Sequence, residues 1–132
     1  MNTVIFGRGN KASSDYFTGE AWVNNILPDG QNSFYSIANV KFQPGARTHW
    51  HTHPAGQVLL VMEGKGYYQE KGKPARLLVK EDVYEIPAHI EHWHGATPDS
   101  RLVHIALTNY KNGEVVEWLN PVTDEEYKRA AE

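Results

Sequence analysis

The chain has 132 residues, a formal net charge of −3 and no cysteine. A chain of this length buries one core without disulfides, and the lack of cysteine excludes a disulfide framework, a thiolate metal site and a cysteine nucleophile. It has 13 basic and 16 acidic residues and no long basic run, so the charge pattern typical of a nucleic-acid-binding protein is missing.

The N-terminus is polar and has no apolar stretch that would serve as a secretory signal. No window approaches the roughly 20 apolar residues that a membrane-spanning helix needs. We therefore expect a cytoplasmic protein with no nucleic-acid or membrane partner.

The predicted elements begin with a polar N-terminal arm, residues 1–32, that carries one strand at 20–26 and a turn at 28–30. Short strand-like runs between turn residues then fill residues 33–120, and residues 115–119 form either a last strand or an arm that packs on the rest. The runs are 34–42, 47–53, 57–62, 66–70, 75–79, 83–86, 92–95 and 101–110. Such spacing, about 8–12 residues between turns, predicts an all-β barrel or sandwich.

Residues 121–132 close the single domain with a short C-terminal helix. Thr123 precedes Asp124, Glu125 and Glu126, which is the pattern of an N-cap followed by acidic residues in the first turn.

All seven histidines lie between residues 49 and 104, and such clustering points to metal binding or acid–base chemistry. Successive side chains of a strand point to opposite faces. In the predicted strand 47–53 the odd positions, His49, His51 and His53, therefore share a face, and Arg47 reads as an ordinary charge at the rim.

The same alternation puts Gln57 on one face of the next strand, and His92 and His94 together on one face of a later strand. In the remaining strands the expected inward faces carry Ala38, Val40, His104 and Thr108. A barrel has one interior, so several imidazoles and one amide are expected to converge there. Imidazole nitrogens and a carboxamide oxygen bind divalent transition metals, and so few protein ligands leave positions open on the metal, which is typical of a catalytic site.

Two segments resemble the two sequence motifs of the cupin family. The first runs Pro44-Gly45, five residues, His51-x-His53, three residues, Gln57, six residues, Gly64. The second runs from Asp82 through Pro87-x-His89-x-x-His92. The chain departs from the usual pattern in two places: Gln57 stands where most cupins have Glu, and His89 stands where Gly is usual, so the turn at His89 is expected to differ.

Longer runs, among them Trp50-His51-Thr52-His53-Pro54 and His92-Trp93-His94-Gly95-Ala96, resemble small manganese-dependent cupin hydroxynitrile lyases and cupins labelled carboxymuconolactone decarboxylases. The resemblance implies an all-β cupin fold, a double-stranded β-helix or jelly-roll barrel, and a homodimer. It implies the metal ligands His51, His53, Gln57 and His92, a catalytic His94, and Ala38, Val40 and Thr108 as lining of the substrate pocket. We add His49 to the pocket by alternation, although those lyases have a small residue there.

The resemblance implies a metal-dependent carbon–carbon lyase that acts on a small hydroxy or carbonyl compound, with manganese as the expected metal and iron, zinc or nickel as alternatives. A neutral Gln57 leaves the cation more Lewis-acidic than a Glu would. Two other functions stay open: a metal-dependent dioxygenase of a small substrate, and a cupin that binds a small molecule without turning it over.

Overall fold

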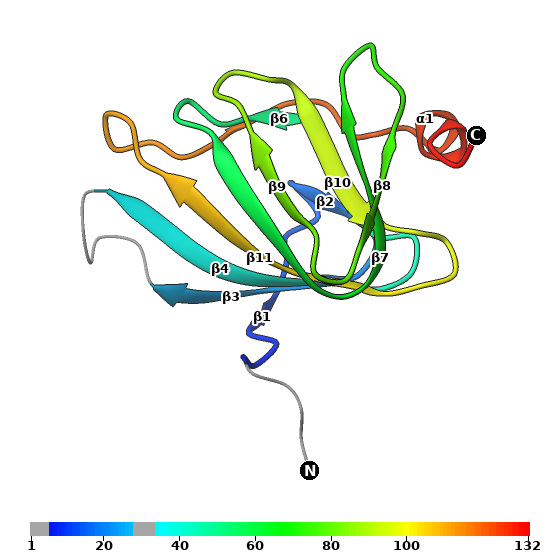
Figure 1. Cartoon of the computed structure of the whole chain (residues 1–132), viewed down its shortest axis with the longest axis horizontal. Helices are drawn as coiled ribbons and strands as arrows, with labels where there is room; N and C mark the ends of the chain where they lie inside the picture. The colour runs from blue at the N-terminus through cyan, green and yellow to red at the C-terminus, as the bar shows by residue number, and fades with distance from the viewer. Residues whose placement is uncertain (1–5, 28–33) are drawn as a thin grey trace.

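The computed structural model of the chain describes residues 6–27 and 34–132 (Figure 1). The expected turn at residues 28–30 lies outside the described residues. Within the described ranges the chain forms twelve strands and one helix. They are β1 Asn10–Lys11, β2 Phe17–Thr18, β3 Ala21–Leu27, β4 Tyr35–Phe42, β5 Arg47–Thr48, β6 His51–Thr52, β7 Gln57–Glu70, β8 Arg76–Val79, β9 Val83–Ile86, β10 His92–Ala96, β11 Leu102–Asn109, β12 Glu117–Trp118 and α1 Asp124–Arg129.

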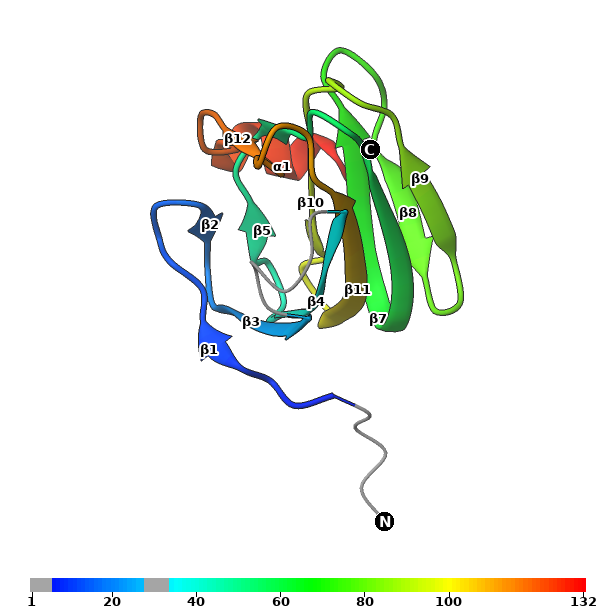
Figure 2. The ribbon, with the colours of Figure 1, turned by 90° about the vertical axis from the view of Figure 1, so that its left-hand side faces the viewer.

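The strands pair antiparallel throughout and make a curled sheet with two halves that face each other (Figure 2). One half has the order β1-β3-β4-β11-β7-β9. In the other half, β7 pairs with β8 on one side and with β10 on the other. Strand β10 then pairs with both β5 and β6. Strand β2 pairs with β5, and β12 pairs with β6. The all-β prediction is confirmed.

Strand β7 belongs to both halves, which corrects the predicted turn between residues 62 and 66. Residues 57–64 of β7 pair with β11, and residues 65–70 pair with β8 and β10. Gly64 has φ +80°, and a Cβ there would lie 1.8 Å from the Arg101 carbonyl oxygen. This glycine therefore marks a sharp bend inside one long strand, where only glycine fits.

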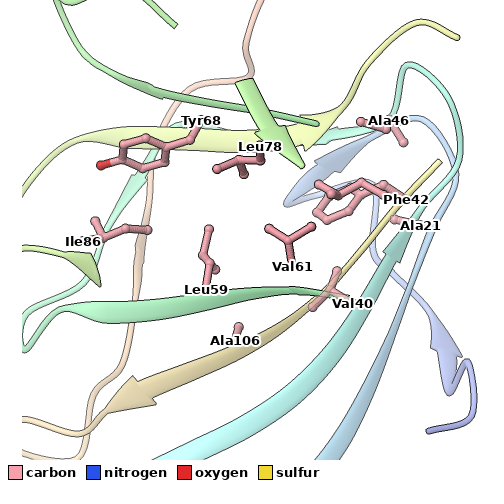
Figure 3. Close-up of a cluster of buried hydrophobic side chains, with 12 residues drawn as sticks. Ala21, Val40, Phe42, Ala46, Leu59, Val61, Tyr68, Leu78, Ile86 and Ala106 are labelled. Atoms are coloured by element: carbon pink, nitrogen blue, oxygen red, sulfur yellow. The ribbon is translucent and has the colours of Figure 1, made fainter. Parts of the chain in front are cut away.

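The main hydrophobic core fills the space between the two halves of the sheet (Figure 3). Phe42, Leu59 and Leu102, from β4, β7 and β11, are fully buried in it. They alternate with more exposed residues along their strands, so the core follows from the period of two in the sequence.

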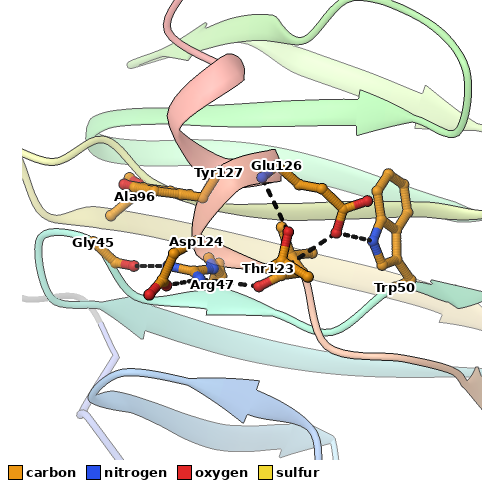
Figure 4. Close-up of polar contacts among 9 residues, drawn as sticks. Gly45, Arg47, Trp50, Ala96, Thr123, Asp124, Glu126 and Tyr127 are labelled. Atoms are coloured by element: carbon orange, nitrogen blue, oxygen red, sulfur yellow. Dashed lines mark hydrogen bonds and ion pairs between the residues drawn. The ribbon is translucent and has the colours of Figure 1, made fainter.

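A second cluster lies on the opposite face of β10, where helix α1 packs. Trp50, Trp93 and Tyr127 are buried together there with Tyr67, Val122 and Ala130. The predicted helix start is confirmed: the Thr123 hydroxyl accepts from the Glu126 N–H, and the Glu126 carboxylate accepts from the Thr123 N–H (Figure 4). Among the described residues, no helix is long and apolar enough to cross a membrane.

Candidate metal centre

The segment 47–53 is not one strand, and this changes which side chains reach the interior. It divides into β5 and β6, with His49 and a bend at Trp50 between them. Because of this bend, even and odd positions do not keep to fixed faces along the segment, and Thr48, His51 and His53 all line the same interior cavity. The strict alternation predicted for this segment is therefore wrong, and His49 is not among the described residues that line the cavity.

Three of the predicted ligands meet in the interior of the fold. His51 on β6, His53 just after it and His92 on β10 each offer one ring nitrogen, and these nitrogens all lie within 4.8 Å of one another. Pairing of β10 with β6 brings His92 opposite His51. The three side chains are buried, so the group is able to hold a metal ion away from bulk water.

The ring orientation of all three histidines suits a metal. Each Nδ1 lies within 2.9 Å of a backbone carbonyl oxygen. The partner of His51 is the His49 carbonyl, that of His53 is the Val115 carbonyl, and that of His92 is the Ile90 carbonyl. A carbonyl only accepts, so each Nδ1 carries the proton and each Nε2 keeps a free lone pair. The Nε2 atoms of His53 and His92 are buried and have no hydrogen-bond partner. Such backbone contacts to the far nitrogen are usual for metal-bound histidines.

Gln57, at the start of β7, lines the same cavity as His51 and His53. Its Nε2 donates to the Thr108 hydroxyl across the β7–β11 pair at 2.9 Å. Its Oε1 is buried without a partner. An unpaired buried oxygen is costly unless something fills the gap, and a cation beside the three imidazoles would do so. The residues present therefore fit a metal site with three nitrogen ligands and one oxygen ligand.

The histidines of the centre are held in the neutral form that binds metals. Burial is the largest cause that lowers the pKa of His53, and it lowers the pKa of His92 to about 4. Burial, followed by the neighbouring His92 and His53, lowers the pKa of His51 well below 6.5. The pKa of His49 is also lowered by burial, but this residue contributes only its backbone carbonyl to the centre.

His94 lies beside the three histidines on the same strand as His92. Its ring centroid is 5.3 Å from that of His51 and 5.7 Å from that of His92. Its backbone N–H donates to the Thr48 hydroxyl, and its Nδ1 is 3.1 Å from His104 Nε2. The Nε2 of His94 is buried without a partner. Burial, followed by the nearby His104, lowers the pKa of His94 well below 6.5, so at neutral pH its ring is uncharged.

The cavity has a volume of about 170 Å³. The polar part of its lining is formed by the histidines His51, His53, His94 and His104 with Ser36, Thr48, Gln57 and Thr108. The structure brings Ala38, Val40 and Thr108 to its wall, as expected. The apolar part is lined by Phe17, Val23, Ala38, Val40, Ala106, Val115, Val116 and Trp118. No Asp, Glu, Lys or Arg lines the cavity among the described residues.

The unusual His89 keeps the backbone conformation that glycine would adopt at this turn. It has φ +65° and is exposed. The left-handed region favours glycine, so a histidine here carries some backbone strain.

Sequence reasoning missed the contribution of the C-terminal segment and of Arg47. The Val115 carbonyl orients His53, and the Trp118 ring lies 4.7 Å from the His51 ring. Arg47 is buried, not a rim charge. Periodicity could not reveal either feature, because residues 115–118 contain only a two-residue strand and Arg47 is polar.

Comparison with known proteins agrees with this architecture. Residues 38–107 match the Cupin domain family. The chain is 38% identical over 119 residues to an (R)-mandelonitrile lyase from Granulicella tundricola, covering 90% of this chain and 91% of that protein.

Among solved structures, a cupin-like protein from Thermotoga maritima superposes with a TM-score of 0.92 at 54% identity, covering 96% of both chains. A polyketide cyclase from Streptomyces resistomycificus shares the fold with a TM-score of 0.64 at 14% identity, covering 82% of this chain and 76% of that one. With the two motifs, the curled antiparallel sheet and the buried histidines all in agreement, the chain belongs to the cupin family.

Proposed function

We propose that this protein is a metal-dependent lyase that cleaves an uncharged cyanohydrin with an apolar, aromatic substituent into a carbonyl compound and hydrogen cyanide. The observation that carries the proposal is that four histidines and a set of uncharged apolar side chains line one cavity. The 38% identity to an (R)-mandelonitrile lyase supports the same reaction class.

The size and lining of the cavity favour an aromatic substrate. A cavity of about 150 Å³ lined by apolar side chains accommodates benzene, and the cavity here has about 170 Å³. Its apolar wall includes Phe17 and Trp118, against which a ring can pack. Since no Lys or Arg lines it among the described residues, a carboxylate substrate would find no cationic partner on the protein. This disfavours the decarboxylase variant of a carbon–carbon lyase.

His51, His53, Gln57 and His92 would hold the divalent cation, which we propose to be Mn²⁺. When bound, the cation supplies a Lewis-acidic centre that stabilises negative charge as it develops on the substrate. The ligand set is neutral, so the full positive charge of the cation acts on the substrate. The same neutrality disfavours a dioxygenase, because no anionic ligand is available to stabilise a higher oxidation state.

His94 is the proposed acid–base group. Its unprotonated form is favoured by the lowered pKa, and its Nε2 is buried without a partner beside the ligand histidines. With the proton of the pair on His94 Nδ1 and His104 Nε2 accepting, the free Nε2 takes the proton of the substrate hydroxyl. The oxygen lone pair then forms the C=O bond, the C–C bond breaks, cyanide leaves with its electron pair, and His94 returns the proton to cyanide.

The test is cyanide release from mandelonitrile by the full chain after metal content has been measured by elemental analysis. Mn-loaded protein is expected to release cyanide above the buffer rate and to prefer one enantiomer, whereas His94→Gln is expected to keep its metal and lose at least ~100-fold in rate. Metal-loaded protein without cyanide release above buffer would refute the proposal. Oxygen consumption with a small diketone would instead support the dioxygenase, and recovery of an unchanged bound ligand would support a binding module.

A further inference from the structure

We propose that Arg47 is a positioning residue for the metal centre, which it controls from the far side of the sheet by anchoring the C-terminal arm. The C-terminal arm is residues 115–122, which form most of the connection between β11 and helix α1. The inference rests on the metal site of the proposed function and concerns Arg47, which is not among the described residues that line the cavity.

The C-terminal arm contacts two of the three histidines of the metal centre. The Val115 carbonyl accepts from His53 Nδ1 at 2.7 Å, and so fixes the ring that must present Nε2. The Trp118 indole packs on the His51 ring with 4.7 Å between centroids, and it also stacks on Tyr16. Two of the three ligand histidines therefore depend on this arm for their surroundings.

The arm is weakly held by its own pairing. Its strand β12 has only two residues, which pair with β6, and the Leu119 N–H and Asn120 carbonyl add one bond each to Trp50. A two-residue pairing is marginal without further packing. The position of the arm therefore depends also on its other end, where it joins helix α1.

Arg47 connects the end of the arm to helix α1 and to the ligand-bearing strands (Figure 4). Its Nη2 donates to the Val122 carbonyl and to the Asp124 carboxylate, both at 2.9 Å. Its guanidinium lies over the Tyr127 ring, 4.5 Å from the centroid. The Tyr127 hydroxyl in turn donates to the Ala96 carbonyl on β10.

Arg47 is itself placed next to the centre. It pairs with Gly95 of β10, between ligand His92 and Ala96. A Cβ on Gly95 would lie 2.5 Å from the Arg47 Cβ, so this glycine makes room for the arginine. The side chain is 7% exposed, whereas that of Asp124 is 89% exposed. An ion pair with an exposed partner contributes little to stability. The function of the buried guanidinium is therefore better explained by its hydrogen bond to the Val122 carbonyl and its packing on the Tyr127 ring.

The test compares Arg47→Met with Arg101→Met in the full chain. Met keeps the apolar stem and removes the donors, so that the buried Val122 carbonyl loses its Arg47 donor and the exposed Asp124 carboxylate loses its ion pair. Arg101 is the control for loss of an arginine ion pair, because it makes a 2.9 Å ion pair with Glu63, a residue of β7 outside the arm. Metal-free protein is titrated with Mn²⁺, free ion is measured by electron paramagnetic resonance, and the melting temperature of each metal-free variant is recorded.

R47M is expected to raise the Mn²⁺ dissociation constant about tenfold or more, as loss of contacts behind a ligand does elsewhere, while R101M stays within about twofold of the parent. R47K, which retains the charge and one donor direction, is expected to fall in between. A folded R47M with a parental dissociation constant and only a lower melting temperature would overturn the inference, because a merely structural role predicts that result.

A second measurement needs no variant. Coupling is reciprocal, so Mn²⁺ binding to the parent must slow hydrogen exchange of the arm, at the Leu119 amide in particular, relative to metal-free protein. Unchanged exchange with bound Mn²⁺ would overturn the inference and leave the proposed function intact. A parent that binds no metal would overturn both.

Discussion

Replacement of Thr108 by Val tests whether the orientation of Gln57 is what makes it a ligand. Val matches Thr in volume but removes the hydroxyl that accepts from Gln57 Nε2 at 2.9 Å. Both residues are buried, with exposures of 5% and 7%. A buried donor left without a partner costs about 1–3 kcal/mol. In metal-free T108V, Gln57 escapes this cost by rotating toward another acceptor, and it must rotate back to bind metal.

The free-energy cost of this rotation makes metal binding less favourable by the same amount. Since about 1.4 kcal/mol is a factor of ten, we expect T108V to weaken Mn²⁺ binding about 5- to 100-fold. Thr108→Ser is the matched control, because it keeps the hydroxyl, and it should bind within about twofold of the parent. Isothermal titration calorimetry on metal-free protein measures both. Equal affinity of T108V and T108S would refute the reasoning and would mean that Gln57 is oriented by something else.

Three further predictions concern stability. The metal-free protein should lose stability on acidification: the folded pKa values of His92 and His104 are about 4 against 6.5 unfolded, so protons favour the unfolded state between pH 6.5 and 4. Urea unfolding should therefore show, for each of the two groups, a loss of about 0.7 kcal/mol between pH 7 and 6 and about 1.2 kcal/mol between pH 6 and 5, and a flat profile would contradict their burial as neutral rings. Gly95→Ala should destabilise the fold by about 1–3 kcal/mol, because its Cβ would lie 2.6 Å from the Ala46 carbonyl oxygen. An unchanged melting temperature would show that the chain at Ala46 moves away from the new Cβ at little cost in free energy. Removing bound metal with a chelator should lower the melting temperature at pH 7, since metal binds only the folded site. An unchanged melting temperature would argue against metal binding at these histidines.

Much of the fold and part of the site could be predicted from the sequence. Every second residue of β11 is buried, and Ser36, Ala38 and Val40 of β4 line the cavity, so the inward positions of Ala38, Val40 and Thr108 followed from a period of two. The Thr123 cap is a local signal and was confirmed as such. The convergence of His51, His53 and His92 followed from two motifs with fixed spacing.

The rest depended on features with no periodic signal. The bend at Trp50 replaces His49 by Thr48 in the cavity, and alternation alone cannot locate such a bend. Gly64 reads as a turn in the sequence, although it bends a strand that continues. Arg47 is a charge that burial alone distinguishes from a surface residue, and its partners Val122 and Asp124 are 75 and 77 residues away along the chain.

The long strand β7 has a consequence for how the protein folds. It pairs with β11 and β9 in one half of the sheet and with β10 and β8 in the other, so neither half is complete without it. The two halves should therefore unfold together in one cooperative transition. Pairing of β7 with β11 must also wait until the chain has been made as far as Asn109. Folding dominated by such non-local pairings takes about milliseconds to seconds, so the histidines meet late and metal is captured by a nearly finished barrel.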